Sequence, residues 1–181
     1  MTTELLWYIA RASGLVSWSM LALATLWGLA LSTKVLGTRP RPNWILDIHR
    51  MLGGLALIFT GVHVAALLVD QYIGFGVEDI LVPFASKWHP VAVAWGVAGL
   101  YLLLAVELTS LARAHLPRRL WRNTHYASFP LFVTATIHGL AAGTDAKLLV
   151  TLMVAGVLAA AFLALTAKRV MGTGPRRSVH A

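Results

Sequence analysis

The stretch ILDIHRMLGGLALIFTGVHVAALLV, residues 45–69, decides the class of fold. As a helix rising roughly 1.5 Å per residue, it is long enough to cross about 30 Å of hydrocarbon. It also contains two histidines, His49 and His63, fourteen residues apart. Ionisable side chains at membrane depth are costly unless they face protein partners. The stretch therefore predicts a transmembrane helix that turns its histidines toward the inside of a helical bundle.

The composition of the whole chain supports a membrane protein. Of its 181 residues, 58% are hydrophobic and 12% are charged, and the mean hydropathy is +0.73. So little charge cannot cover the surface of a soluble domain. The net charge of +8 lies in short gaps between apolar runs, as in cytoplasmic loops, so we expect membrane lipid and no nucleic acid as a partner. The absence of cysteine excludes disulfides, iron–sulfur clusters and thiolate ligation of haem.

Five apolar segments predict an all-α bundle of five transmembrane helices, near residues 5–33, 45–69, 90–112, 121–142 and 146–168. The first loop, the third loop and the tail are rich in Lys and Arg, whereas the second and fourth loops carry most of the Asp and Glu. The positive-inside rule therefore predicts an outer N-terminus and a cytoplasmic C-terminus. We expect a multi-pass protein of the cell membrane, in a bacterium the plasma membrane, with a membrane domain over residues 1–170 and a flexible basic tail over 171–181.

The second loop, residues 71–89, is long and partly apolar, which leaves two interpretations open. One is a short interfacial helix that begins near Asp79 and lies over the outer mouth of the bundle. The other is an ordered lid with a structural role only.

Two further histidines, His125 and His138, lie thirteen residues apart in the fourth predicted span. The second and fourth spans run in the same direction, so His49 and His125 are expected near the inner leaflet and His63 and His138 at the outer level. Neutral imidazole is a good axial ligand for haem iron. A hydrogen-bonded core histidine, or a haem-free transporter or channel with histidines along a proton or metal path, is the alternative. Matched depths on two parallel helices favour paired haem ligands.

The helical phase of the two histidines differs between these spans. On an ideal helix, fourteen residues bring His63 to within roughly 40° of the His49 face, whereas thirteen residues leave His125 and His138 about 140° apart. Pro130 lies between them and removes one backbone hydrogen bond. The sequence therefore predicts local overwinding or a kink near Pro130, or haem planes rotated relative to each other.

Two arginines are candidate partners of the acidic groups of such a cofactor. Arg11 lies about two turns into the first span, near the outer level, where it either binds a haem propionate or extends to the lipid headgroups. Arg50 follows the inner histidine and either does the same there or serves as a positive-inside residue. Glycines beside the histidines either make room for a macrocycle or mediate ordinary helix packing: Gly53, Gly54, Gly61 and Gly139.

Set side by side, several segments resemble the ferric reductase-like transmembrane domain family, whose haem core also occurs in NADPH oxidases and in the haem subunit of bacterial methionine-sulfoxide reductase. The segments are ARASGLVSW, DIHRMLGGLALIFTGVHV, DILVPFASKWHPVAV, AVELTSLARAHLPRRLWRNTHYASF and ATIHGLAAGTDA, which together cover nearly the whole chain. The resemblance implies two b-type haems, with iron ligated by His49 with His125 and by His63 with His138.

The resemblance further implies a di-haem transmembrane cytochrome that carries electrons from a cytoplasmic or membrane donor to an outer acceptor, such as ferric chelate, a flavoprotein partner or oxygen. Family members that use NADPH directly carry a flavin and nucleotide domain. No Gly-rich dinucleotide loop is present here, so we expect the membrane subunit of an oxidoreductase with a separate donor: a flavoprotein, free flavin or a quinol. A quinol-oxidising cytochrome b subunit that feeds a periplasmic reductase is the alternative within the same chemistry.

Overall fold

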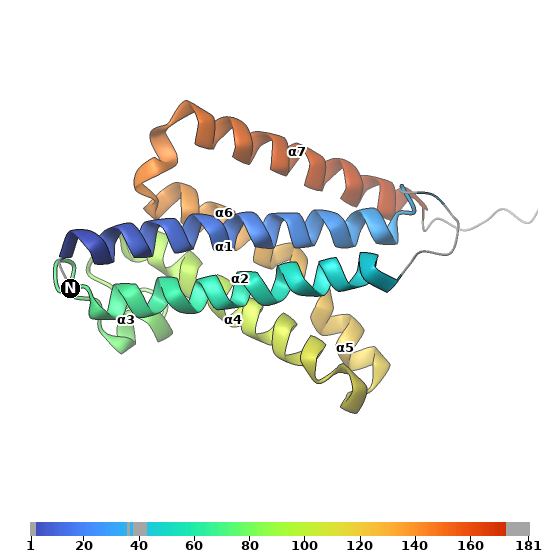
Figure 1. Ribbon diagram of the computed structural model, residues 1–181, viewed down its shortest axis with the longest axis horizontal. Coiled ribbons are helices and arrows are strands. Elements are labelled where there is room, and N and C mark those ends of the chain that lie inside the picture. The colour runs from blue at the N-terminus through green and yellow to red at the C-terminus, as the bar shows by residue number, and fades with distance from the viewer. Residues whose placement is uncertain (1–2, 36, 38–42, 173–181) are drawn as a thin grey trace, which may run out of the picture.

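The structure is a computed structural model that describes residues 3–35, 37 and 43–172, and the only regular structure in these ranges is helical (Figure 1). The predicted basic tail, 171–181, lies outside the described residues from 173 onward. The helices are α1 (Thr3–Ser32), α2 (Asn43–Val69), α3 (Val77–Leu81), α4 (Pro90–Leu111), α5 (Arg118–His125), α6 (Ser128–Ala142) and α7 (Leu149–Gly172), with short 3₁₀ turns η1 (Arg113–His115) and η2 (Thr144–Lys147).

Four of the described helices, α1, α2, α4 and α7, are long and apolar enough to cross a membrane. They correspond to the first, second, third and fifth predicted spans. The chain is therefore an all-helical, multi-pass membrane protein.

The fourth predicted span, 121–142, is not one continuous helix but is divided between α5 and α6. At the division the Ala127 N–H donates to the Thr124 carbonyl at 2.9 Å, and the Phe129 N–H donates to the Tyr126 carbonyl at 3.1 Å. These i to i−3 bonds are tighter than those of an α-helix. Pro130 lacks an N–H and its ring crowds the carbonyl four residues earlier, which is that of Tyr126. Of the alternatives that the sequence left open at Pro130, the structure shows local overwinding. The proline lies in the first turn of α6, where no N–H is needed.

The helices are arranged as two antiparallel pairs with an outer cover. α1 packs along α2, and α4 packs along α6. α7 packs on the side of α1 that faces away from α2 (Figure 1). Phe162 of α7 meets Phe132 of α6 and Leu29 of α1 in one buried cluster.

An aliphatic layer fills the middle of the bundle. It consists of one buried side chain from each of four helices: Leu21, Ala56, Leu103 and Leu131. Ala56 lies seven residues from both His49 and His63 on α2. Seven residues are nearly two helical turns, about 10 Å. The aliphatic layer therefore lies midway between the two histidine levels.

The loop over residues 71–89 contains a short helix, one of the two interpretations that the sequence left open. α3 begins at Val77, close to the expected start near Asp79. The Asp79 carboxylate accepts a hydrogen bond from the Gly76 N–H at 2.7 Å, which satisfies a free donor at the helix start. The Tyr101 hydroxyl of α4 donates to the Leu81 carbonyl at 2.8 Å and fastens the end of α3 to the bundle.

Candidate functional site: two pairs of facing histidines

The fold brings the four histidines of the spans together in two pairs, one toward each end of the bundle. The ring centroids of His49 and His125 are 6.0 Å apart with an interplanar angle of 73°. Those of His63 and His138 are 6.4 Å apart at 78°. The fourteen residues between His49 and His63 place the two pairs about 21 Å apart along α2.

Three of the four imidazoles are hydrogen-bonded through Nδ1 to main-chain carbonyls of a neighbouring helix. His49 Nδ1 lies 3.0 Å from the Ala24 oxygen, and His63 Nδ1 lies 2.7 Å from the Ala10 oxygen. His138 Nδ1 lies 2.8 Å from the Ala92 oxygen. A carbonyl can only accept, so Nδ1 carries the proton in each ring and Nε2 keeps its lone pair.

The same helices present a glycine one turn after each of these carbonyls. A Cβ added at Gly14 would lie 2.9 Å from His63 Nδ1, and one at Gly28 would lie 3.0 Å from His49 Cε1. A Cβ at Gly96 would lie 2.7 Å from His138 Cε1. These glycines therefore leave the space in which the imidazole rings sit against the backbone.

Sequence reasoning missed these positions, although the sequence contains a signal for them. An Ala-x-x-x-Gly pattern occurs at residues 10–14 and 24–28 of α1 and again at residues 92–96 of α4. The two copies in α1 are fourteen residues apart, like His49 and His63 of the antiparallel α2. The match of spacings indicates the carbonyl and the glycine of α1 that face each of these two histidines.

The glycines chosen from the sequence do not face the histidines. A Cβ at Gly53 would lie 2.5 Å from Glu107 Oε1, so this glycine accommodates a carboxylate of α4. At Gly54, Gly61 and Gly139 a Cβ would meet no atom within 4 Å. Gly53 thus serves helix packing, one of the two roles that the sequence left open, whereas the space beside the other three is compatible with either role.

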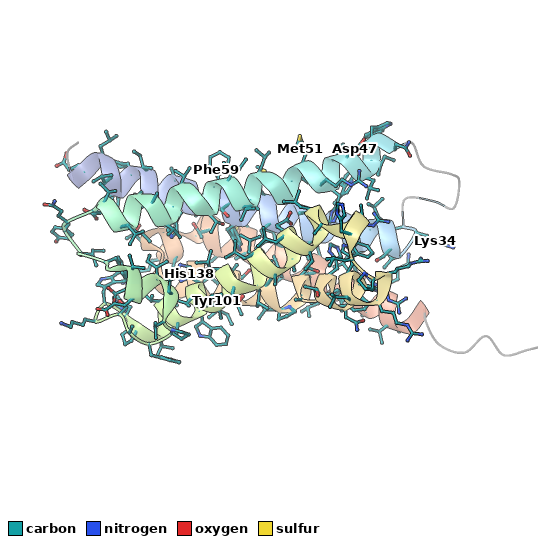
Figure 2. The ribbon with its side chains drawn as sticks, turned by 90° about the horizontal axis from the view of Figure 1, so that it is seen from below. Lys34, Asp47, Met51, Phe59, Tyr101 and His138 are labelled. Atoms are coloured by element: carbon teal, nitrogen blue, oxygen red, sulfur yellow. The ribbon has the colours of Figure 1, made fainter. Side chains whose placement is uncertain are left out.

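We name the His63–His138 pair the outer pair and the His49–His125 pair the inner pair, after the levels expected from the sequence. A cavity of about 280 Å³ adjoins the outer pair. It is lined by His63 and His138, by Gly14 and Gly96, and by Asp79 of α3. Figure 2 shows His138 toward the end of the bundle opposite Lys34 and Asp47. The short helix α3 thus forms part of the wall of the chamber beside the outer histidines.

Arg11, the first arginine singled out in the sequence, also lines this cavity. Its Nε lies 2.5 Å from Asp145 Oδ2 and its Nη2 pairs with Asp145 Oδ1, so the contact is bidentate. Its guanidinium lies 4.9 Å from the centre of the Trp7 ring. Asp145 was not foreseen, because it is 134 residues from Arg11 in the sequence. The ion pair ties the N-terminal part of α1 to η2.

Arg50, the second arginine, forms an ion pair with Asp47, with 3.2 Å between Nη1 and Oδ1. Both side chains are more than half exposed. Other residues approach the inner pair instead. The Trp121 ring stacks on His125 with centroids 5.3 Å apart, and the Arg113 guanidinium lies 4.6 Å from the centre of the Trp121 ring. Trp121 Nε1 is buried and makes no hydrogen bond. The inner site therefore contains a free donor that the sequence did not reveal.

Among the described residues, no group of three or more His, Asp or Glu side chains converges to hold a metal ion. The histidines are grouped in twos. Two protein ligands are too few for a protein-only metal site, but they are the number that a porphyrin leaves open on its iron.

The fold and these pairs define a class: a helical membrane protein with facing histidines at two levels. The chain belongs to the family described as ferric reductase like transmembrane component, whose model matches residues 13–136, well over half of the chain. The match includes His49, His63 and His125 and ends two residues before His138. Membership indicates a transmembrane electron-transfer component. Neither a curated protein nor a solved structure matches the chain significantly.

Proposed function

We propose that the protein is a di-haem b-type transmembrane cytochrome, with His49 and His125 as the ligands of an inner haem and His63 and His138 as those of an outer haem. The observation that carries the proposal is the occurrence of two facing imidazole pairs at two levels of one bundle. Family membership supports an electron-transfer role for such pairs.

The geometry of the pairs fits a metal bound between them. An imidazole nitrogen binds a metal at about 2 Å, so two imidazoles on opposite sides of one metal have centroids roughly 6 Å apart. The observed centroid distances are 6.0 and 6.4 Å. An edge-to-face ring contact has a similar distance, but it does not require Nε2 to be left free in His49, His63 and His138. The cavity beside the outer pair and the free Trp121 N–H beside the inner pair agree with a bound cofactor.

The protein's own residues orient the ligands. Each Nδ1–H donated to a carbonyl fixes the tautomer and the plane of the ring, and it raises the basicity of Nε2. Haem, when bound, supplies reversible one-electron chemistry at its iron. Arg11 lines the outer cavity and is our candidate for a propionate partner there. Arg50 is exposed, so Arg113 and Trp121 are better candidates at the inner level.

The aliphatic layer argues against a haem-free proton or metal channel. Leu21, Leu103 and Leu131 lie between the two levels and are at most 7% exposed. A path for protons or cations needs a continuous series of polar groups or water, whereas electrons can pass through a layer of aliphatic side chains. The layer therefore favours electron transfer between two haems.

We further propose five membrane crossings, with the N-terminus outside and the C-terminus in the cytoplasm. α6 alone, with fifteen residues, spans about 22 Å. α5 extends it toward the membrane surface, where Arg118, Arg119 and Arg122 suit the cytoplasmic interface. Electrons would pass from a flavoprotein, free flavin or quinol to the inner haem and leave from the outer haem to ferric chelate, a flavoprotein partner or oxygen. A bacterial plasma membrane is the expected location.

The test is the haem content of the purified protein. We expect two b-type haems per chain, seen as a Soret band and a sharp α band on reduction. His63→Ala removes one ligand of the outer haem, so the content should fall to one haem per chain. A colourless protein, prepared with ample haem, would contradict the proposed function.

The matched control is His115→Ala, because His115 is exposed, lies in η1 and belongs to neither pair. This variant should keep both haems. Equal haem content in His63→Ala and the unaltered protein would mean that His63 is not a ligand.

A further inference from the structure

The partner of His125 differs in kind from the partners of the other three histidines. Its Nδ1 lies 3.4 Å from the Oγ of Ser110 on α4, whereas the others face main-chain carbonyls. A carbonyl cannot be removed by substitution and can only accept a hydrogen bond. A serine hydroxyl can donate as well as accept, and it is set by the sequence.

The place of Ser110 in the helix explains the difference. Ser110 lies fourteen residues after Gly96 on α4, as Gly28 lies fourteen residues after Gly14 on α1. Ser110 therefore stands at the fourth histidine where a glycine stands at each of the other three. It has a hydroxymethyl group where those glycines have no side chain. That group extends toward His125, the last residue of α5.

The hydroxyl of Ser110 is committed to this contact. Thr109, the preceding residue, donates to the Ala105 carbonyl of its own helix at 2.7 Å, as helical Ser and Thr often do. The side chain of Ser110 makes no such bond within the described part of α4, and its hydrogen bond is to His125. A hydroxyl that forgoes the carbonyl of its own helix points to a role at the ring.

We propose that Ser110 is a positioning residue of the inner haem. This inference rests on the proposed di-haem function. If Nε2 of His125 binds the iron, Nδ1 carries the proton and donates a hydrogen bond to Ser110 Oγ, which accepts it. The bond holds the ring plane together with the stacked Trp121 and increases the electron density on the imidazole, which stabilises ferric relative to ferrous iron.

The experiment compares Ser110→Ala with Ser110→Thr in the haem-loaded, full-length protein by redox titration of the α band. Ser110→Ala removes the acceptor, so the preference of one haem for the ferric state should fall by up to about tenfold. This corresponds to a rise in midpoint potential of up to about 59 mV for a one-electron couple. Ser110→Thr keeps the hydroxyl and should restore the original potential. Thr109→Ala is the matched control and should change neither haem.

The affected haem is identified in the His63→Ala background, where only the inner haem is expected. There Ser110→Ala should shift the single remaining potential. Two haems in the unaltered protein with both potentials unchanged in Ser110→Ala would overturn the role of Ser110 and leave the proposed function intact. Equal shifts of both haems would also overturn it, since they indicate a general structural change. Absence of haem from the unaltered protein would instead overturn the proposed function.

Discussion

At the scale of single residues, the site depends on how closely backbone approaches each imidazole. Gly14 and Gly28 are on one helix, face His63 and His49 respectively, and leave about the same space. Each ring hydrogen-bonds to a carbonyl one turn before the glycine and therefore lies against the backbone of that helix. Only glycine allows this approach without a steric clash. The carbonyl and the glycine therefore act as one unit, which occurs at each of three histidines.

Gly14→Ala and Gly28→Ala should each damage only one site. The new methyl group would lie 2.9 Å from His63 Nδ1 or 3.0 Å from His49 Cε1 and displace that ring. Since loss of a group that orients a ligand typically weakens binding about 10- to 100-fold, we expect Gly14→Ala to lose the outer haem and Gly28→Ala the inner one. Haem titration of each variant measures this.

The two variants control for each other, because both replace a glycine of α1 that lies four residues after the carbonyl to which the histidine is bonded. Gly156→Ala on α7, where a Cβ meets no atom within 4 Å, should bind both haems normally. Equal loss of both haems from Gly14→Ala and from Gly28→Ala would show that the glycines serve helix packing rather than individual rings.

At the scale of elements, the division between α5 and α6 decides how His125 faces its partner. On a straight helix, thirteen residues would turn His125 about 140° away from His138. The tightened turn at Tyr126 and Ala127 changes that phase, and both rings then face partners on α2. A broken helix at membrane depth also requires polar backbone groups to be satisfied, which the i to i−3 bonds accomplish.

Pro130→Ala should straighten the α5–α6 segment and remove the inner haem. Alanine restores the missing N–H and favours continuous helix by up to about 3 kcal/mol. The outer haem should remain, because His138 and its bond to Ala92 lie beyond the division. Haem stoichiometry and the spectrum of the reduced α band measure the result.

Pro90→Ala is the matched control, since Pro90 begins α4, where the missing N–H costs nothing. It should keep both haems. Retention of both haems by Pro130→Ala would mean that packing of α5 against α4 imposes the division without the proline.

At the scale of the whole molecule, the acidic residues of α3 and the arginines of α5 lie toward opposite ends of the bundle. α3, with its acidic residues, lies at the end of the bundle where the N-terminus is, whereas α5, with its arginines, lies at the other end (Figure 1). Asp145 pairs with Arg11 in the N-terminal part of α1. Lys34 lies at the same end as α5 (Figure 2). This separation is the reason for the orientation that we propose.

Labelling of single cysteines tests that orientation, because the chain has no cysteine of its own. Lys87→Cys, in the exposed segment before α4, should react with a membrane-impermeant maleimide on intact cells. His115→Cys, in the exposed turn after α4, should react only after permeabilisation. The reverse labelling pattern would mean that the orientation of the chain in the membrane is opposite to the one proposed. Labelling of both positions on intact cells would contradict a crossing by α4.

The sequence by itself determined the membrane class, four of its five predicted spans as continuous helices, and the family. It named a short helix in the second loop and overwinding near Pro130 among the alternatives that it left open. Hydropathy and proline effects act over one or two helical turns, so they can be predicted from neighbouring residues. It also singled out the four histidines, whose two pairings the structure brings together. Their role as haem ligands stays a prediction that the haem content will test.

Only the tertiary structure decided what surrounds these histidines. The bond from His63 to the Ala10 carbonyl joins residues 53 apart, and the pairing of Arg11 with Asp145 joins residues 134 apart. Such contacts depend on which faces of two helices meet, and hydropathy does not encode that choice when most faces are apolar. Arg50 shows conversely that a neighbour in the sequence need not be a neighbour of the ring. It follows His49 in the sequence, yet it pairs with Asp47 at an exposed position. The packing of helices, rather than proximity along the chain, selects the neighbours of each imidazole.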